Sequence, residues 1–169
     1  MPVTIETERL IISEFDENDA PFIQKLVNSD GWLRFIGDRG VRNIEDAITY
    51  LRNGPIKSYT ENGFGLWRVA LKHSQIPVGM CGLLKRDTMA DIDIGFAMLP
   101  EFFKKGYTSE AAIATLEFAK NTLKLKRVVA ITKPDNVASI GLLQKLGFVN
   151  EGIIAFNSED TVLLGFNFE

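Results

Sequence analysis

The most informative part of this 169-residue chain is Leu99–Ala111, which reads LPEFFKKGYTSEA. The run before it, Asp91–Met98, has the acidic and apolar pattern of a strand, and Pro100 begins a turn. A basic loop that contains Gly106 follows and leads into a helix. Because the first amides of a helix lack intrahelical partners and lie at the positive end of its dipole, such a loop is suited to binding an anion. Taken alone, the segment fits an ordinary strand-to-helix connection with solvated lysines equally well.

The segments on either side of this loop predict strands and helices over the whole chain. Alternating and short apolar runs predict strands at 9–15, 65–71, 78–85, 91–98, 127–132, 148–156 and 161–168. Apolar residues at helical spacing predict helices at 17–29, 44–57, 137–146 and from the basic loop to about residue 123. Residues 31–42 have the pattern of a loop. Because no linker, repeat or low-complexity segment interrupts this order, we expect one mixed α/β domain over residues 1–169.

Composition excludes several classes of protein. Hydrophobic residues at 46% and charged residues at 24% are typical of a soluble globular protein. A net charge of -3 gives no general attraction to nucleic acid or to an anionic membrane. The first residues lack the basic and apolar pattern of a secretion signal, and one cysteine excludes an internal disulfide, so we expect a cytoplasmic protein. One cysteine and one histidine cannot form a typical His/Cys metal site, so no metal is expected.

Three segments carry a resemblance to a known family. Pro134–Phe148 (PDNVASIGLLQKLGF) resembles the Asn-x-x-Ser…Lys-x-Gly-Phe signature of GCN5-related N-acetyltransferases, the GNAT family. Gly106–Ala111 resembles the Gly-Tyr-x-(Ser/Thr)-Glu-Ala stretch of the RimJ/RimL branch, which acetylates protein N-termini, and Glu8–Ile12 resembles its opening strand. The resemblance implies a GNAT-like α/β fold, with a twisted, mixed but mostly antiparallel central sheet of about seven strands flanked by four helices. It also implies acetyl-CoA as the cosubstrate.

The resemblance further implies which residues hold the cosubstrate. The pantetheine arm is expected to pair with the backbone near Ala97 and Met98. The pyrophosphate is expected on the backbone amides of Phe103, Lys104, Lys105, Gly106, Tyr107, Thr108 and Ser109. The family often has Gln or Arg at the first of six loop positions and Gly or Ala at the last, where this chain has Phe103 and Thr108. Because amides of the backbone donate whatever the side chain, we still expect the loop to bind.

Asn136 and Ser139 are the next candidates. Asn136 is expected to hydrogen-bond the pantetheine amides, to cap the helix that follows, or to do both. Ser139 either donates a proton to the departing sulfur as a general acid or hydrogen-bonds local backbone. Many family members have a tyrosine acid four positions beyond this serine, where this chain has Leu143. A thiolate with a pKa of about 8.5 is already a fair leaving group, so a strong acid is not essential.

The base and the acceptor pocket are less specific. Strand alternation puts Asp93 on the face opposite Ile92 and Ile94, where it is either a general base that accepts the amine proton through water or a solvated carboxylate. The resemblance implies that Trp32, Asp38 and Arg39 border the acceptor pocket. Their alternative roles are helix packing and a polar turn.

These residues favour one function and leave others open. The leading hypothesis is direct acetyl transfer from acetyl-CoA to a primary amine, with a protein or peptide N-terminus favoured by the branch resemblance. The alternatives are acetylation of a small amine, polyamine or antibiotic, and a CoA-binding module without catalysis, which the altered loop and Leu143 would suit. Apart from the amine acceptor, no nucleic-acid or membrane partner is expected. The oligomeric state stays open, with a homodimer as one option.

Overall fold

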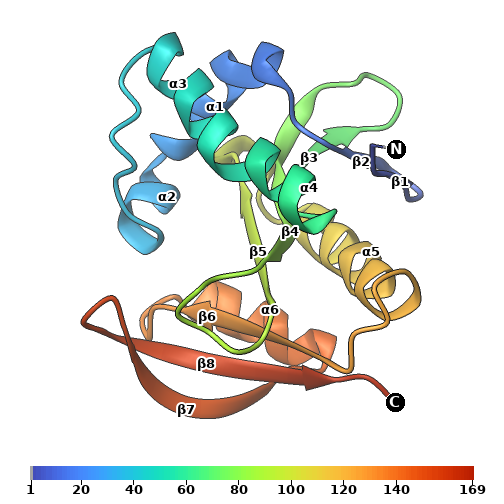
Figure 1. Cartoon of the computed structure of the whole chain (residues 1–169), viewed down its shortest axis with the longest axis vertical. Coiled ribbons are helices and arrows are strands. Elements are labelled where there is room, and N and C mark those ends of the chain that lie inside the picture. Colours follow the sequence, from blue (N-terminus) through green and yellow to red (C-terminus); the bar gives the residue numbers. More distant parts are fainter. Residues whose placement is uncertain (1) are drawn as a thin grey trace.

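The computed structural model describes residues 2–169, and the strands of these residues form one sheet (Figure 1). In this part of the chain the sheet has eight strands in the order β1-β2-β3-β4-β5-β6-β8-β7. They are β1 (Thr4–Glu6), β2 (Leu10–Ser13), β3 (Leu66–Leu71), β4 (Pro77–Leu84), β5 (Asp93–Met98), β6 (Arg127–Thr132), β7 (Val149–Phe156) and β8 (Glu159–Asn167). Neighbours pair antiparallel except β5 and β6, which are parallel. The predicted mostly antiparallel sheet is confirmed, with one strand more because β1 is too short to show an alternating pattern.

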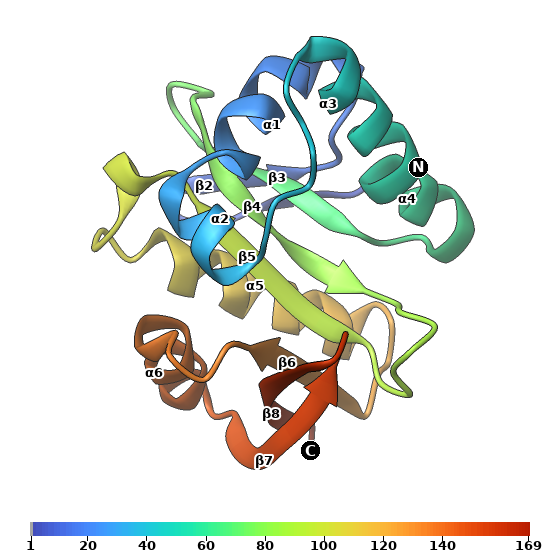
Figure 2. The same ribbon diagram turned by 90° about the vertical axis from the view of Figure 1, so that its left-hand side faces the viewer.

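Helices cover both faces of the sheet (Figures 1 and 2). One face carries α1 (Ala20–Val27), α2 (Asp30–Phe35) and α3 (Ile44–Leu51), and α4 (Lys57–Asn62) follows α3 in the chain. The other face packs against α5 (Tyr107–Asn121) and α6 (Val137–Leu146). Short 3₁₀ turns at Glu17–Asp19 and Pro100–Phe102 precede α1 and α5.

Side-chain alternation on the central strands divides the core between the two faces. On β5, Ile94 and Met98 belong to the buried cluster beneath α5, whereas Ala97 packs against the cluster beneath α1, α2 and α3. The helix α5 presents small residues to the sheet, so it approaches closely, and the Thr115 hydroxyl lies 3.4 Å from Cys81 Sγ on β4. Each face of the sheet therefore has its own packed layer.

Residues 30–35 and 58–62 are helical where the sequence predicts no helix, so six α-helices replace the expected four within residues 2–169. Residues 30–35 form α2 instead of part of a loop, because Trp32 is buried against α1 and α3 and this packing stabilises a helix too short to form alone. A π-helical turn, Arg52–Ile56, joins α3 to α4 and contains Pro55. Its wider turn accommodates a residue that has no amide hydrogen.

The sheet opens between its two parallel strands. Strands β5 and β6 share one register pair, Asp93 with Val129, and the Val129 amide donates to the Ile92 carbonyl at 3.0 Å. Beyond that pair, β6 continues against β8 and β5 continues against β4. The strands therefore part toward their carboxyl ends, which is where ligands bind in open α/β sheets. The loop to α5 and the start of α6 both follow these ends.

Two kinds of feature are absent from residues 2–169. No helix between Pro2 and Glu169 is both long enough and apolar enough to cross a bilayer. The same residues contain no group of three or more His, Cys, Asp or Glu side chains placed to hold a metal ion.

Candidate functional site

The loop between β5 and α5 presents unused backbone amides. The Phe103 amide donates to the Pro100 carbonyl at 3.1 Å, and the next amide that donates is that of Glu110, to the Gly106 carbonyl at 3.1 Å. Between them, the amides of residues 104–109 donate no hydrogen bond to any part of residues 2–169. Positive φ angles of 61° at Lys104 and 81° at Gly106 give the loop the left-handed residues typical of anion-binding nests. The arrangement suits a phosphate or diphosphate group.

Arg9 and Glu110 hold this loop in place. The Glu110 carboxylate accepts from Thr7 Oγ1 at 2.5 Å, from the Arg9 amide at 2.8 Å and from Arg9 Nε at 2.7 Å. Arg9 Nη1 donates to the Lys105 carbonyl at 2.8 Å, and its guanidinium lies 4.6 Å from the centre of the Tyr107 ring. Burial acts to raise the pKa of Glu110, but the hydrogen bonds from Thr7 and Arg9 outweigh it and lower the pKa. These contacts, which we call the brace, fix the loop through the Lys105 carbonyl and side chains. They leave the backbone amides of the loop without partners in residues 2–169.

Sequence reasoning did not identify this brace. Glu8–Ile12 and Glu110 each lie in a segment that resembles the family, but nothing in either segment shows that they meet. The contact exists because the turn between β1 and β2 lies beside the first turn of α5.

The open edge of β5 has a defined set of main-chain groups. The Leu99 amide donates to the Val78 carbonyl at 2.8 Å, and Ala97 pairs with Met80 in the same ladder. Because every second residue of an antiparallel ladder bonds a given neighbour, Ala97 is committed to β4, whereas Phe96 and Met98 point their amides and carbonyls away from it. The ladder therefore favours Phe96 and Met98, rather than Ala97, for pairing with a bound arm.

Asn136 caps α6, as its position in the sequence predicts. Its Oδ1 accepts from the Ser139 amide at 3.3 Å. Its Nδ2 group and the Ser139 hydroxyl make no hydrogen bond with any described residue, and both side chains are partly exposed. Cap and ligand contact are therefore compatible, because they use different atoms of the amide. Leu143, where the family often has tyrosine, is 1% exposed and belongs to the core.

Asp93 is not the open carboxylate that strand alternation predicts. It is 1% exposed, and its two oxygens accept from Arg86 at 2.9 and 3.3 Å. Burial raises the pKa of this carboxyl although Arg86 opposes the shift. Asp93 also lies at the closed end of the opening, where β5 and β6 pair through Val129. The expectation of a solvent-facing side chain is wrong, and a role as base stays a prediction.

The three predicted acceptor residues do not converge. Trp32 is 4% exposed in the core, with an indole nitrogen that has no partner in the described part of the chain. Asp38 accepts from Gly40 and from both terminal nitrogens of Arg42, and the Arg42 hydrogen bond lowers the pKa of Asp38 to about 2. Arg39 is exposed and makes no hydrogen bond or ion pair within residues 2–169. Of the three, Arg39 is the one that is both exposed and without a hydrogen-bond or ion-pair partner in the described residues, and a role of any of them in binding the acceptor stays a prediction.

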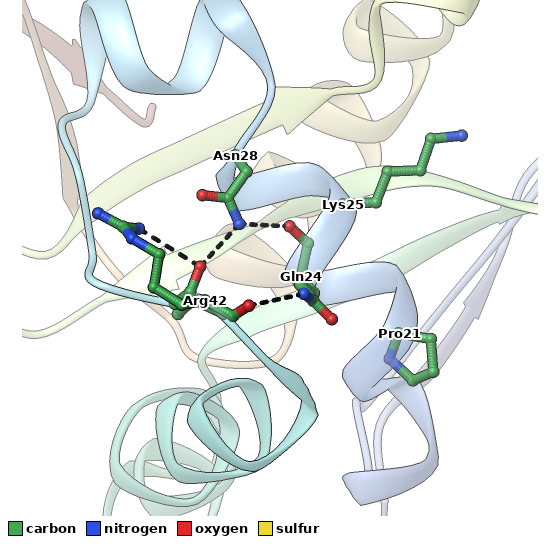
Figure 3. Close-up of a pocket in the computed structure, with 6 residues that line it drawn as sticks. Pro21, Gln24, Lys25, Asn28 and Arg42 are labelled. Carbon is green, nitrogen blue, oxygen red and sulfur yellow. Dashed lines mark hydrogen bonds between the residues drawn. The ribbon is translucent and has the colours of Figure 1, made fainter.

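Two hollows flank the loop that carries Asp38 and Arg39, and neither is lined by the loop to α5. The first, of about 490 Å³, lies between this loop and α1 (Figure 3). Asn28 Nδ2 donates there to the carbonyls of Gln24 and Val41 at 2.7 and 2.9 Å, and Gln24 Nε2 donates to the Arg42 carbonyl at 3.1 Å. These amides anchor the loop to α1. The polar side chains in the hollow of Figure 3 are therefore used to hold the loop against α1.

Comparison with known proteins agrees with the geometry. The model of the acetyltransferase (GNAT) domain family matches residues 9–149. A Bacillus subtilis (strain 168) protein described as the uncharacterized N-acetyltransferase YoaA is 29% identical over 152 residues, which cover 89% of this chain and 85% of that protein. A GNAT-family acetyltransferase from Bacillus anthracis superposes with a TM-score of 0.81 at 27% identity and covers 98% of each chain.

A structure of RimL, described as a ribosomal L7/L12 alpha-N-protein acetyltransferase, also superposes with a TM-score of 0.81. It is 17% identical and covers 99% of this chain and 96% of its own. At that identity the likeness is one of fold.

Proposed function

The chain belongs to the GNAT acetyltransferase family, and from that premise we propose that it moves an acetyl group from acetyl-CoA directly to a primary amine. The observation that carries the proposal is the row of unused amides at residues 104–109, at the start of α5. A helix start with free amides favours a dianionic diphosphate, and Lys104 and Lys105 add positive charge beside it.

The other groups of the site fit an extended arm that carries amides and a thioester. The main chain of Phe96 and Met98 can pair with the arm as a further strand would, and Asn136 Nδ2 can donate to one of its carbonyls. An amide of β5 that points into the opening would polarise the thioester oxygen. Each of these roles uses an atom that the fold leaves without a partner in residues 2–169.

The transfer forms a carbon–nitrogen bond and breaks a carbon–sulfur bond, so a proton must leave the amine and the sulfur departs as a thiolate or a thiol. We assign the proton for the sulfur to the Ser139 hydroxyl, which has no partner in the described residues. Asp93 is the proposed acceptor of the amine proton, through water and only with rearrangement of Arg86. If Asp93→Asn has the wild-type dependence of kcat/KM on pH, Asp93 is excluded.

For the acceptor, the α-amine of a peptide or protein is the first candidate, because RimL is described as acting on such an amine and has the same fold. Small amines and polyamines are the second. An assay of thiol release with peptides, small amines and polyamines in parallel separates these classes.

The central test uses two left-handed glycines. Gly106 has a φ of 81°, and a Cβ there would lie 3.1 Å from Arg9 Nη2, whereas Gly63, with a φ of 78°, ends α4 with nothing within 4 Å. Gly106→Ala should weaken acetyl-CoA binding by about tenfold or more in isothermal titration, equivalent to ~1.4 kcal/mol. Gly63→Ala carries the same backbone strain and should bind as wild type does. Failure of the wild-type protein to bind acetyl-CoA at millimolar concentration would end the proposal.

A further inference from the structure

The second hollow, of about 350 Å³, lies on the other side of the loop that carries Arg39, between this loop and α3. Arg39 lines it from the loop, Thr49 and Tyr50 line it from α3, and Asn53 lines it from the π-helical turn. A π-helical turn is rare and is often found at functional sites. We call these four residues the Arg39 cluster.

The side chains of the Arg39 cluster are unpaired. No hydrogen bond or ion pair within residues 2–169 involves the Arg39 guanidinium, the hydroxyls of Thr49 and Tyr50, or the Asn53 amide. The one carboxylate that lines the hollow, Asp46, already accepts from the Arg42 amide at 3.0 Å. This differs from the hollow of Figure 3, whose amide side chains are used to anchor backbone. The second hollow is therefore rich in hydrogen-bond donors that the fold does not use.

The chemistry of the Arg39 cluster matches a carboxylate. A guanidinium presents a planar pair of donors that fits the two oxygens of a carboxylate, and the hydroxyls and the amide can supply further donors. Burial raises the pKa of the Tyr50 phenol, so it stays protonated and able to donate at neutral pH.

The hollow lies on the face of the sheet opposite α5. Tyr50 packs against the same core cluster as Ala97, whose side chain projects from β5 toward α1–α3. The helix α5, whose first turn carries the unused amides, packs against the opposite face. An acceptor bound at the hollow would thus approach the sheet from the face opposite α5 (Figure 2).

We infer that the Arg39 cluster binds a carboxylate of the acceptor, so that the enzyme prefers primary amines that carry a carboxylate close to the amine. This inference rests on the proposed function and narrows its substrate class. Two sources supply such a carboxylate: a free amino acid and a peptide with an acidic side chain near its N-terminus.

The test compares acceptors that differ only in charge. One arm uses a free amino acid and its carboxamide, and the other uses N-terminal dipeptide amides with Asp or Asn at the second position. With the wild-type enzyme, KM for the acid should be lower than KM for the matching amide by about tenfold or more in one of the two arms. The arm that shows this difference identifies the source of the carboxylate. Arg39→Gln should remove this preference by raising KM for the acid with little change in kcat, and Tyr50→Phe should weaken it.

Arg52→Gln is the matched control. Arg52 lies next to Asn53, but it is ion-paired with Glu17 at 2.6 Å and does not line the hollow. The variant loses the same charge and should keep the preference. An equal fall in preference in both variants would mean general electrostatics and would overturn the inference.

The two proposals fail in different ways. Turnover with equal KM for acid and amide in both arms would refute the carboxylate site and leave acetyl transfer intact. If no amine releases thiol from acetyl-CoA, the proposed function fails, and the cluster is then judged by titrating the N-acetylated amino acid and the N-acetylated Asp dipeptide amide into the protein. Saturable binding that Arg39→Gln abolishes supports the site, and its absence overturns it.

Discussion

A single residue, Glu110, does much to hold the loop that leads to α5. Its carboxylate binds Thr7 and Arg9, and Arg9 in turn binds the Lys105 carbonyl. The side chain is 18% exposed, so these hydrogen bonds are only partly screened by solvent. One carboxylate therefore connects the first turn of α5 to the N-terminal strands.

Glu110→Gln should lower the free energy of unfolding by about 1–2 kcal/mol at pH 7, because the charge-assisted hydrogen bonds are lost. The folded-state pKa of Glu110 is lowered from the ordinary value of a glutamate, so its contribution is complete above that ordinary value and disappears as the pH falls through the lowered pKa. The difference between wild type and variant in urea unfolding should therefore shrink below about pH 4.5. A difference that is constant from pH 7 to pH 3 would contradict this.

Asn136 allows the cap and the ligand contact to be separated. Asn136→Ser keeps an oxygen that can accept from the Ser139 amide but loses the Nδ2 donor, so stability should change little while KM for acetyl-CoA rises several-fold. Asn136→Ala loses both and should also cost about 1 kcal/mol of stability. Thermal unfolding and steady-state kinetics on both variants decide the matter. Wild-type kinetics in Asn136→Ser would remove this residue from the site.

At the scale of elements, polar contacts join α2 to the segment that follows β6. Lys133 Nζ, just after β6, donates to the Arg34 carbonyl at 3.3 Å, and the Arg34 guanidinium lies 3.7 Å from the Asp135 carboxylate. These contacts tie α2 to the segment between β6 and α6, beyond the carboxyl end of β6. The side chains that make these contacts are at least partly exposed.

Lys133→Ala should loosen α2 without unfolding the protein. Exposed contacts of this kind contribute about 0–1 kcal/mol, so the global free energy of unfolding should change little. Amide hydrogen exchange at residues 30–37 should become faster, because the Arg34 carbonyl loses its partner. Lys57→Ala, which removes the exposed pair with Glu61, is the control and should leave α2 unchanged. Unchanged exchange in Lys133→Ala would show that core packing alone holds α2.

The elements also show what the sequence could predict. Strand β6 and helix α6 have their predicted bounds, because Asn136 and Gly147 mark both ends of α6 with local chemistry. The start of α5 follows Gly106 in the same way. The helix α2 was missed because its stability comes from Trp32 packing against distant segments, which no local pattern records.

In the candidate site, too, some features follow from local sequence and others depend on contacts between distant segments. The unused amides of residues 104–109 follow from a local pattern, a glycine-containing loop before a helix, so the sequence could locate them. The brace through Arg9 and the burial of Asp93 beneath Arg86 depend on which segments meet in space. The preference for Phe96 over Ala97 depends on strand register, which alternation alone does not fix.

At the scale of the whole molecule, the two faces of one sheet carry separate core clusters, and each contains one tryptophan. Trp67 is buried beneath α5, where its ring meets Phe118 edge-on at 5.0 Å, and Trp32 is buried beneath α1–α3. Both clusters pack on the same sheet, so we expect them to unfold together.

Single-tryptophan variants test this. Trp67→Phe leaves Trp32 as the reporter of one face, and Trp32→Phe leaves Trp67 as the reporter of the other. In each variant the urea midpoint from fluorescence should coincide with the midpoint from far-ultraviolet circular dichroism, although both midpoints fall below that of the wild type. A fluorescence transition that precedes the loss of secondary structure in either variant would show that the faces unfold independently.

The packing of α5 on β4 has a practical consequence. Cys81 is fully buried beside Thr115, and burial raises the pKa of its thiol to about 12, so the reactive thiolate is scarce at neutral pH. A cysteine introduced at an exposed position of α2, such as Leu33→Cys, would then be the sole target for a maleimide dye on the folded protein. The movement of α2 can thus be followed by a single fluorophore, with the native thiol left in place.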